Sequence, residues 1–331
     1  MSNSWGRRGS FLAAALSVIA LLGVGCTNPP GTGGAPPTTT IVPLAGPPGE
    51  FSVLSYNVAG LPQGISGSDP ETNLALISPR LNDYDVVLTQ EDFDWWQPLL
   101  DGLPFANHHR WLRGSADHPY RSGQHPGPYA VGLDPTSRPL FVGDGLGMMA
   151  RYPFTEPERV PWAGCYGVLD GASDCLAMKG FSVATMTLAD GYVVDVYDLH
   201  AEAGGTDTDQ ALQVDDYAQL AAFIKAHSAG RAVVLAGDTN LHTDVTDPAD
   251  TDFADAAIWA GFLAETGLTD VCAELSCAEP GNIDKAAYRD GGGVDLSALS
   301  HDYPTEDFLD SAGADLSDHP PLAVRFAWDG A

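Results

Sequence analysis

Short apolar runs bounded by Gly, Pro and Asp recur through most of the chain. Their lengths and their content of Val, Ala, Leu and Tyr are typical of β-strands. The runs that we predict as strands span residues 51–57, 85–90, 145–151, 181–188, 192–199, 232–237 and 321–328. Ala189-Asp190-Gly191 separates two of these runs and predicts a hairpin turn.

Helical periodicity is found in fewer segments. Residues 208–228 place Tyr217, Leu220, Ala221 and Ile224 on one face, with acidic residues predicted opposite. Two further helices are predicted, one over residues 252–265, whose first turn is acidic, and one over residues 71–82, interrupted near Pro79. Strands outnumber helices and are mixed with them, which favours an α/β or α+β class with substantial sheet. The sequence has no internal repeat and no dinucleotide or Walker-type glycine motif.

The amino-terminal residues 1–25 have the pattern of an export signal. Arg7 and Arg8 precede an apolar stretch, residues 11–24, that is too short to span a bilayer comfortably. Residues 21–26 resemble a bacterial lipobox ending at Cys26, although Gly23 stands where Leu is usual. We predict a lipoprotein attached to the membrane through lipidated Cys26, at the cell surface or the periplasmic face. An ordinary cleaved signal, giving a secreted protein, and an anchor helix are the alternatives.

Two further segments complete the predicted organisation. Residues 26–49 are rich in Pro, Gly and Thr with almost no charge, so we predict a flexible tether. Residues 50–331 then form the globular domain. The chain of 331 residues carries a net charge of −29, and all its acidic residues lie at or after Glu50. Such a field repels nucleic acid; solubility in a salty or acidic habitat is the alternative explanation.

Four cysteines remain besides Cys26. Their even number in an exported chain favours disulfides, and Cys165–Cys175 and Cys272–Cys277 are the simplest pairing. A metal site is disfavoured, because neither pair has the close spacing of a zinc knuckle and no His is nearby.

Five segments place polar groups at or near the end of an apolar run. They are Ser55-Tyr56-Asn57, Thr89-Gln90-Glu91, Asp198-Leu199-His200, Gly237-Asp238-Thr239-Asn240 and Ser317-Asp318-His319. Hydrolysis of a phosphodiester needs a cation, donors for the developing charge, an activated water and help for the leaving oxygen. Together these segments supply the carboxylates, carboxamides and imidazoles for that chemistry.

Three residues are candidates for a metal site. Glu91 is the strongest, because Mg²⁺ prefers carboxylate oxygens; a solvated carboxylate at a strand end is the alternative. Asn57 could share the metal shell, hold the phosphate or cap the turn that follows it. Asp318 could supply a second metal carboxylate.

Five residues are candidates for catalysis. Asp238 and Asn240 are two apart, so in extended backbone they would point the same way, toward a water and the phosphorus; a turn rich in Asp and Asn is the alternative. His319 suits a general base, with Asp284 holding its tautomer. His200 could donate to a phosphate oxygen. A structural or solvated role is the alternative for either His.

With these motifs in this order, the chain resembles the endonuclease/exonuclease/phosphatase superfamily, which includes DNase I-like nucleases and the neutral and bacterial sphingomyelinases. The resemblance implies a four-layered α/β sandwich of two packed mixed β-sheets with helices outside. It also implies that Asn57 and Glu91 bind Mg²⁺, or else Mn²⁺ or Ca²⁺, with help from Asp318. By the same resemblance Asp238 and Asn240 hold water and phosphate, His200 contacts the phosphate, and Asp284 orients the base His319. Asp198 departs from the Asn often found there.

The substrate is not decided by the fold or by these motifs. Three features favour a lipid substrate. They are the acidity of the chain, the predicted membrane tether, and the aromatic residues of the stretch 161–181 with Trp95 and Trp96. Packing of Trp95, Trp96 and Trp162 against the sheet is the alternative. We therefore expect a metal-dependent phosphodiesterase of the sphingomyelinase or phospholipase C kind. A secreted nuclease, a phosphomonoesterase acting on sugar or inositol phosphates, and a tethered binding module without activity are the other hypotheses.

Overall fold

The computed structural model describes residues 47–61, 66, 68–93, 109–123, 143–167 and 174–330. These residues belong to one compact unit, Ile41–Ala331. The predicted signal, Cys26, nearly all of the tether, and Trp95 and Trp96 lie outside the described residues, so the predictions made for them stay predictions. None of the helices in the described ranges has the length and apolar composition needed to cross a bilayer.

Two six-stranded mixed sheets form the centre of the fold. In spatial order the first contains β11 (Val294–Asp302), β12 (Leu322–Gly330), β1 (Gly49–Asn57), β2 (Val86–Gln90), β4 (Gly147–Ala150) and β3 (Tyr120–Arg121). The second contains β5 (Glu158–Pro161), β6 (Gly180–Ala189), β7 (Tyr192–His200), β8 (Ala232–Asp238), β10 (Asp284–Arg289) and β9 (Thr269–Asp270). Each sheet has one parallel pair, β1 with β2 and β7 with β8, and its other pairs are antiparallel.

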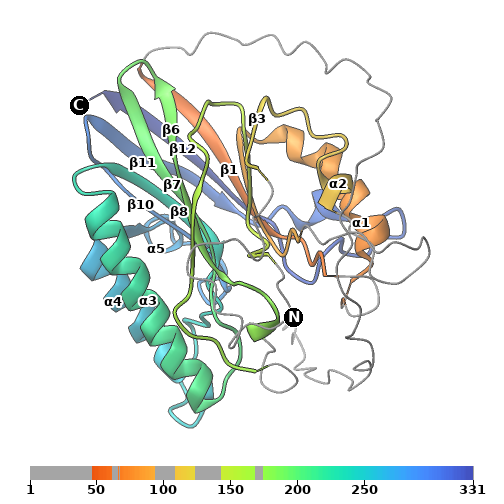
Figure 1. Ribbon diagram of the computed structural model, residues 1–331, viewed down its shortest axis with the longest axis vertical. Coiled ribbons are helices and arrows are strands. Elements are labelled where there is room, and N and C mark those ends of the chain that lie inside the picture. The colour runs from red at the N-terminus through yellow and green to blue at the C-terminus, as the bar shows by residue number, and fades with distance from the viewer. Residues whose placement is uncertain are drawn as a thin grey trace, which may run out of the picture. The chain divides into compact units, whose positions relative to one another are not determined.

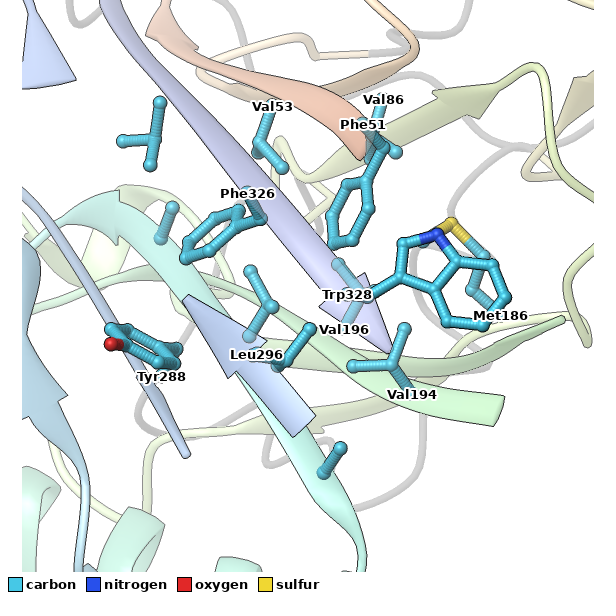
Figure 2. Close-up of a cluster of buried hydrophobic side chains, with 14 of the residues drawn as sticks. Phe51, Val53, Val86, Met186, Val194, Val196, Tyr288, Leu296, Phe326 and Trp328 are labelled. Atoms are coloured by element: carbon cyan, nitrogen blue, oxygen red, sulfur yellow. The ribbon is translucent and has the colours of Figure 1, made fainter. Parts of the chain in front are cut away.

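The two sheets pack face to face through their apolar sides (Figure 2). Phe51 and Phe326 from the first sheet stack with their ring centroids 5.5 Å apart, and Tyr288 from the second sheet meets Phe326 edge-on at 5.4 Å. Val194 and Val196 continue this layer and are buried. Alternate residues of the strands thus face a common core, as in sheet-on-sheet packing.

Helices cover the outer face of each sheet (Figure 1). Helices α3 (Asp207–His227) and α4 (Asp255–Thr266) bury apolar residues against the second sheet. Helices α1 (Pro70–Ile77) and α2 (His109–Leu112) lie over the first sheet, and the short α5 (Val271–Leu275) packs beside β10 and β11. The order is helices, sheet, sheet, helices, so the predicted four-layered α/β sandwich is confirmed.

The predicted helices are present with shifted ends. A hydrogen-bonded capping box of Thr206 and Asp209 starts α3, and α1 changes to a 3₁₀ segment, Ser78–Asp83, near Pro79 as predicted. The helix predicted over residues 252–265 starts as a 3₁₀ turn, Thr251–Ala254, before α4. Two acidic residues of α3, Asp209 and Asp216, are buried and accept backbone N–H groups.

The two predicted disulfides are present, with Cα–Cα distances of 5.3 Å for Cys165–Cys175 and 4.8 Å for Cys272–Cys277. The expectation that no His lies near the cysteines is wrong for the second pair. His301, distant in sequence, lies on β11 with a ring nitrogen within 4.8 Å of both sulfurs.

Candidate active site

The ends of both parallel strand pairs converge on one site. Asn57 is in register with Gln90, the residue before Glu91. In the other sheet Asp238 is in register with both His200 and Asp284. The carboxyl ends of parallel strands lie at the same edge of a sheet, and the antiparallel β10 begins there. These pairings therefore place the polar residues of five strand ends close together.

Two glycines allow the strand ends to approach. A Cβ on Gly60 would lie 2.3 Å from the carbonyl oxygen of Glu91, and one on Gly237 would lie 2.2 Å from the carbonyl oxygen of Leu199. Glu91 and Asn240 have left-handed backbones, with φ of 54° and 50°. Left-handed conformations of residues other than Gly are strained and concentrate at functional sites, so the strain observed here supports a functional role for this edge.

Asn57 lies at the centre of the cluster. Its Nδ2 donates to Asp238 Oδ2 at 3.0 Å and lies 3.5 Å from both Glu91 Oε1 and His319 Nε2. Its Oδ1 accepts the backbone N–H of Ala59, and its backbone carbonyl accepts from Ser317 Oγ. Asn57 therefore joins the ends of both sheets to the segment that carries His319.

His319 is oriented by two carboxylates. Its Nδ1 lies 2.9 Å from Asp284 Oδ2, and its Nε2 lies 3.7 Å from Asp238 Oδ2. Burial opposes protonation, but the negative charges of Asp284 and Asp238 outweigh it and hold the pKa of His319 well above its usual range. With a proton on Nδ1 shared with Asp284, Nε2 is the nitrogen that can exchange a proton with a substrate or water.

His200 has the opposite electrostatic setting. Its Nε2 lies 3.3 Å from Asp238 Oδ2. Burial, reinforced by the charge of Lys179, holds the pKa of His200 well below its usual range. The imidazole is therefore neutral near pH 7 and can act only as a hydrogen-bond donor or acceptor there.

Glu91 and Asp318 provide an excess of negative charge. Burial, reinforced by the charge of Asp318, raises the pKa of Glu91 to about 7. A divalent cation would relieve that repulsion, and the carboxylate oxygens with the Asn57 amide are the donor types that Mg²⁺ takes. In the present arrangement Asn57 turns its NH₂ toward Glu91, so ligation through Oδ1 requires the amide to turn over. The donors of Asp238, Asp284 and His319 also lie within 4.8 Å of one another, close enough to share an ion.

The geometry predicted for Asp238 and Asn240 is wrong in one respect. Strand β8 ends at Asp238, and the left-handed Asn240 turns the chain, so the two residues do not alternate along an extended strand. They still meet, because the Asn240 backbone N–H donates to Asp238 Oδ1 at 3.0 Å. The Asn240 side-chain NH₂ donates to the carbonyl of Ala201, which leaves its Oδ1 as the acceptor.

Several contributors were missed from the sequence. Lys179 falls within the aromatic stretch and has no predicted role of its own, yet it pairs with buried Asp174. Its charge opposes the rise in the pKa of Glu91 and helps to lower the pKa of Asp238. Gln90 of the first sheet donates to Asp198 of the second at 2.6 Å. Burial holds the pKa of Asp198 well above its usual range. The available signals are a Lys between Met178 and Gly180 and a Gln at the end of an apolar run.

Trp162 does not face a membrane. It is buried, packs on Phe181 with ring centroids 5.3 Å apart and donates from Nε1 to the carbonyl of His200. The alternative that Trp162 packs a loop against the sheet is the correct one. Trp162 therefore does not support a lipid substrate.

Comparisons with known proteins identify the family of the chain. Residues 54–319 match the model of the Endonuclease/Exonuclease/phosphatase family. Proteins named sphingomyelinase from Mycobacterium bovis and Mycobacterium tuberculosis are 33% identical over 301 residues, which cover 88% of this chain and 54% of theirs. The chain thus spans about half the length of these curated relatives.

Solved structures share the fold. Sphingomyelinase C from Streptomyces griseocarneus matches with a TM-score of 0.56 at 20% identity, over 84% of this chain and 99% of that one. A beta-toxin variant from Staphylococcus aureus with bound magnesium ions matches with a TM-score of 0.57 at 17% identity, over 83% and 99%. The predicted superfamily resemblance is confirmed.

Proposed function

The chain belongs to the endonuclease/exonuclease/phosphatase family, and on this premise we propose that it is a Mg²⁺-dependent phosphodiesterase of the sphingomyelinase or phospholipase C kind. One observation carries the proposal. The 2.9 Å contact between Asp284 and His319 directs His319 Nε2 toward the cluster of Asn57, Asp238 and Glu91. An oriented imidazole next to paired carboxylates and an amide is suited to activating water beside a bound phosphate.

Glu91, Asp318 and Asn57 would hold the metal ion. When bound, Mg²⁺ neutralises charge on a phosphate oxygen and polarises the phosphorus. Mn²⁺ or Ca²⁺ would fit the same oxygen donors, with Ca²⁺ requiring more ligands and a looser site. The magnesium named for the Staphylococcus aureus structure supports the choice of Mg²⁺.

The remaining residues transfer the proton of the attacking water and bind the phosphate. Asp238 and Asn240 orient the attacking water, and His319 Nε2 accepts its proton. The resulting imidazolium is stabilised by Asp284 and Asp238, as the raised pKa of His319 implies. Neutral His200 donates a hydrogen bond to a phosphate oxygen, and the buried charge of Lys179 favours the developing negative charge.

A membrane phospholipid is the proposed substrate. The net charge of −29 disfavours a polyanionic duplex, because affinity for phosphate backbones comes mostly from Lys and Arg. The relatives named sphingomyelinase point to the same class. Export and attachment through Cys26 would place the site at a membrane surface, and this localisation is part of the proposal.

The test compares four substrates with the purified chain and Mg²⁺: sphingomyelin vesicles, phosphatidylcholine vesicles, duplex DNA and inositol phosphates. We expect phosphocholine release from sphingomyelin to be the fastest reaction. Faster cleavage of DNA would establish the nuclease alternative, and release of inorganic phosphate would establish the phosphomonoesterase. Binding to vesicles without turnover of any substrate would support the tethered binding module and contradict the enzyme.

A further inference from the structure

Cys272, Cys277 and His301 form a cluster of soft donors outside the candidate active site. The two sulfurs and one imidazole nitrogen all lie within 4.8 Å of one another. Cys272 lies in the first turn of α5 and Cys277 directly follows the residue that ends it, Ser276, while the His comes from β11, against which α5 packs. Because the cluster contains sulfur and nitrogen donors, it differs in chemistry from the oxygen-rich site around Glu91.

The backbone brings the two cysteines together independently of the sulfur–sulfur bond. Ser276 has a left-handed conformation, with φ of 55°, and ends α5. The N–H of Cys277 bonds to the carbonyl of Cys272, and that of Ser276 to the carbonyl of Ala273. These are the two hydrogen bonds of a Schellman motif, which places the side chains at the Cys272 and Cys277 positions in contact. The sulfurs therefore remain neighbours when the disulfide is opened.

His301 is suited to complete a metal site. Its Nε2 is buried and has no hydrogen-bond partner among the described residues. An edge-to-face contact with Tyr303, at 5.2 Å between ring centroids, fixes the ring. A buried nitrogen without a partner is costly, and a metal ion beside it would remove that cost.

We propose that Cys272, Cys277 and His301 are a second metal site, for a thiophilic ion such as Zn²⁺ or Cu⁺, which is available when the Cys272–Cys277 disulfide is reduced. Two thiolates and one imidazole fill three positions of a tetrahedral ion and leave the fourth to water. This donor set selects Zn²⁺ or Cu⁺ over Mg²⁺, so the ion would not compete with the one held by Glu91.

The disulfide and the metal ion use the same sulfurs. A phosphine reductant takes up oxygen from water, breaks the S–S bond and leaves two thiols and a phosphine oxide. Binding of Zn²⁺ then releases the two thiol protons and needs no electron transfer. Reoxidation by dioxygen, which takes two electrons from the thiolates and two protons from water to become hydrogen peroxide, restores the S–S bond and frees the ion. The site can therefore bind a metal ion under reducing conditions and cannot bind one under oxidising conditions.

The test uses Co²⁺ as a spectroscopic substitute for Zn²⁺ on the full chain, reduced with a phosphine under argon. Thiolate coordination gives an absorption that oxygen ligands cannot give, so Co²⁺ bound near Glu91 does not interfere. We expect one thiolate-bound Co²⁺ per chain, displaced by Zn²⁺, in the reduced protein and none in the oxidised protein.

Two variants make the test specific. Cys272→Ser/Cys277→Ser keeps the other three cysteines and should lose the absorption. His301→Ala should weaken Co²⁺ binding by about tenfold or more. Loss of a residue that only hydrogen-bonds to a metal ligand already lowers metal affinity by about that factor, and His301 would be a ligand itself. Near-UV circular dichroism of the oxidised His301→Ala protein checks its fold. The proposal is overturned if the reduced wild type shows no thiolate absorption, if the double Ser variant retains it, or if folded His301→Ala binds Co²⁺ as tightly as the wild type.

Discussion

At the scale of single residues, the two site histidines are given different charges by their neighbours. His319 contacts Asp284 and Asp238 and favours the protonated form, whereas His200 is buried beside the charge of Lys179 and stays neutral. Both share the same partner, Asp238. His319 thus holds a proton firmly once it has accepted one, and His200 is fixed as a neutral hydrogen-bonding group.

Asp284→Asn tests how His319 is held. The amide can donate to Nδ1 and favour the tautomer whose Nε2 already carries the proton. We expect kcat to fall by about 10²- to 10⁴-fold, the range typical of general acid–base catalysis, while KM changes little. Steady-state kinetics on the best substrate measure it, and an unchanged kcat would remove Asp284 from the mechanism.

Glu202→Gln tests how the ionisation of a buried carboxyl outside the candidate active site affects stability. Burial, with the charge of Asp174, raises the pKa of Glu202 to about 9 from an ordinary 4.5. Because the folded pKa is the higher one, Glu202 stabilises the fold fully below pH 4.5, and this contribution is lost as the pH rises to about 9.

The uncharged Gln should therefore raise the free energy of unfolding at pH 7 by about 1 to 3 kcal/mol and flatten its pH dependence. Urea unfolding from pH 4.5 to 9 measures this. Exposed Glu306→Gln is the matched control, with an expected change below about 0.5 kcal/mol. Lower stability of Glu202→Gln at pH 7 would contradict the account.

At the scale of elements, α3 begins at a capping box that fixes the chain just after His200. Thr206 accepts the N–H of Asp209, and the Asp209 carboxylate accepts the N–H of Thr206. We expect Thr206→Ala to lower the free energy of unfolding by about 1 kcal/mol, measured by urea denaturation.

Thr208→Ala, an exposed change within the same helix, controls for loss of a Thr and should have little effect. Equal stability of the Thr206→Ala and Thr208→Ala proteins would show that the capping box does not hold the helix start.

Elements with a strong apolar pattern were predictable from the sequence, and others were not. The predicted strand over residues 232–237 corresponds to β8, because a buried strand next to a parallel partner is apolar on both faces. β10 contains Asp284, Lys285 and Arg289, and β11 alternates buried and exposed residues at a sheet edge. Neither has an apolar run, and both form because a neighbouring strand supplies their hydrogen bonds.

The candidate site residues were predictable from the sequence where a polar side chain directly follows an apolar run. Asn57, Glu91, His200 and Asp238 follow apolar runs, and their side chains meet in the structure. The contribution of Lys179, the bond between Gln90 and Asp198, and the approach of His301 to the cysteines depend on packing of segments distant in sequence. No local pattern encodes such contacts.

At the scale of the whole molecule, the sandwich positions one site with parts from both sheets. His200, Asp238 and Asp284 come from the second sheet and Asn57 from the first, and Asn57 bonds across to Asp238. Chelation of the metal should therefore remove activity without unfolding the chain, because the two sheets are joined by their shared core. We expect EDTA to abolish hydrolysis with the circular dichroism spectrum unchanged, and Mg²⁺ to restore it. Activity that persists in EDTA would contradict metal dependence.

The most direct measurement is phosphocholine release from sphingomyelin vesicles with Mg²⁺, comparing the wild-type chain with His319→Ala. The account predicts release by the wild type and a rate at least about 10²-fold lower in the variant, with vesicle binding retained. Equal rates in the two proteins would contradict the central claim that His319 and its carboxylate neighbours form the active site.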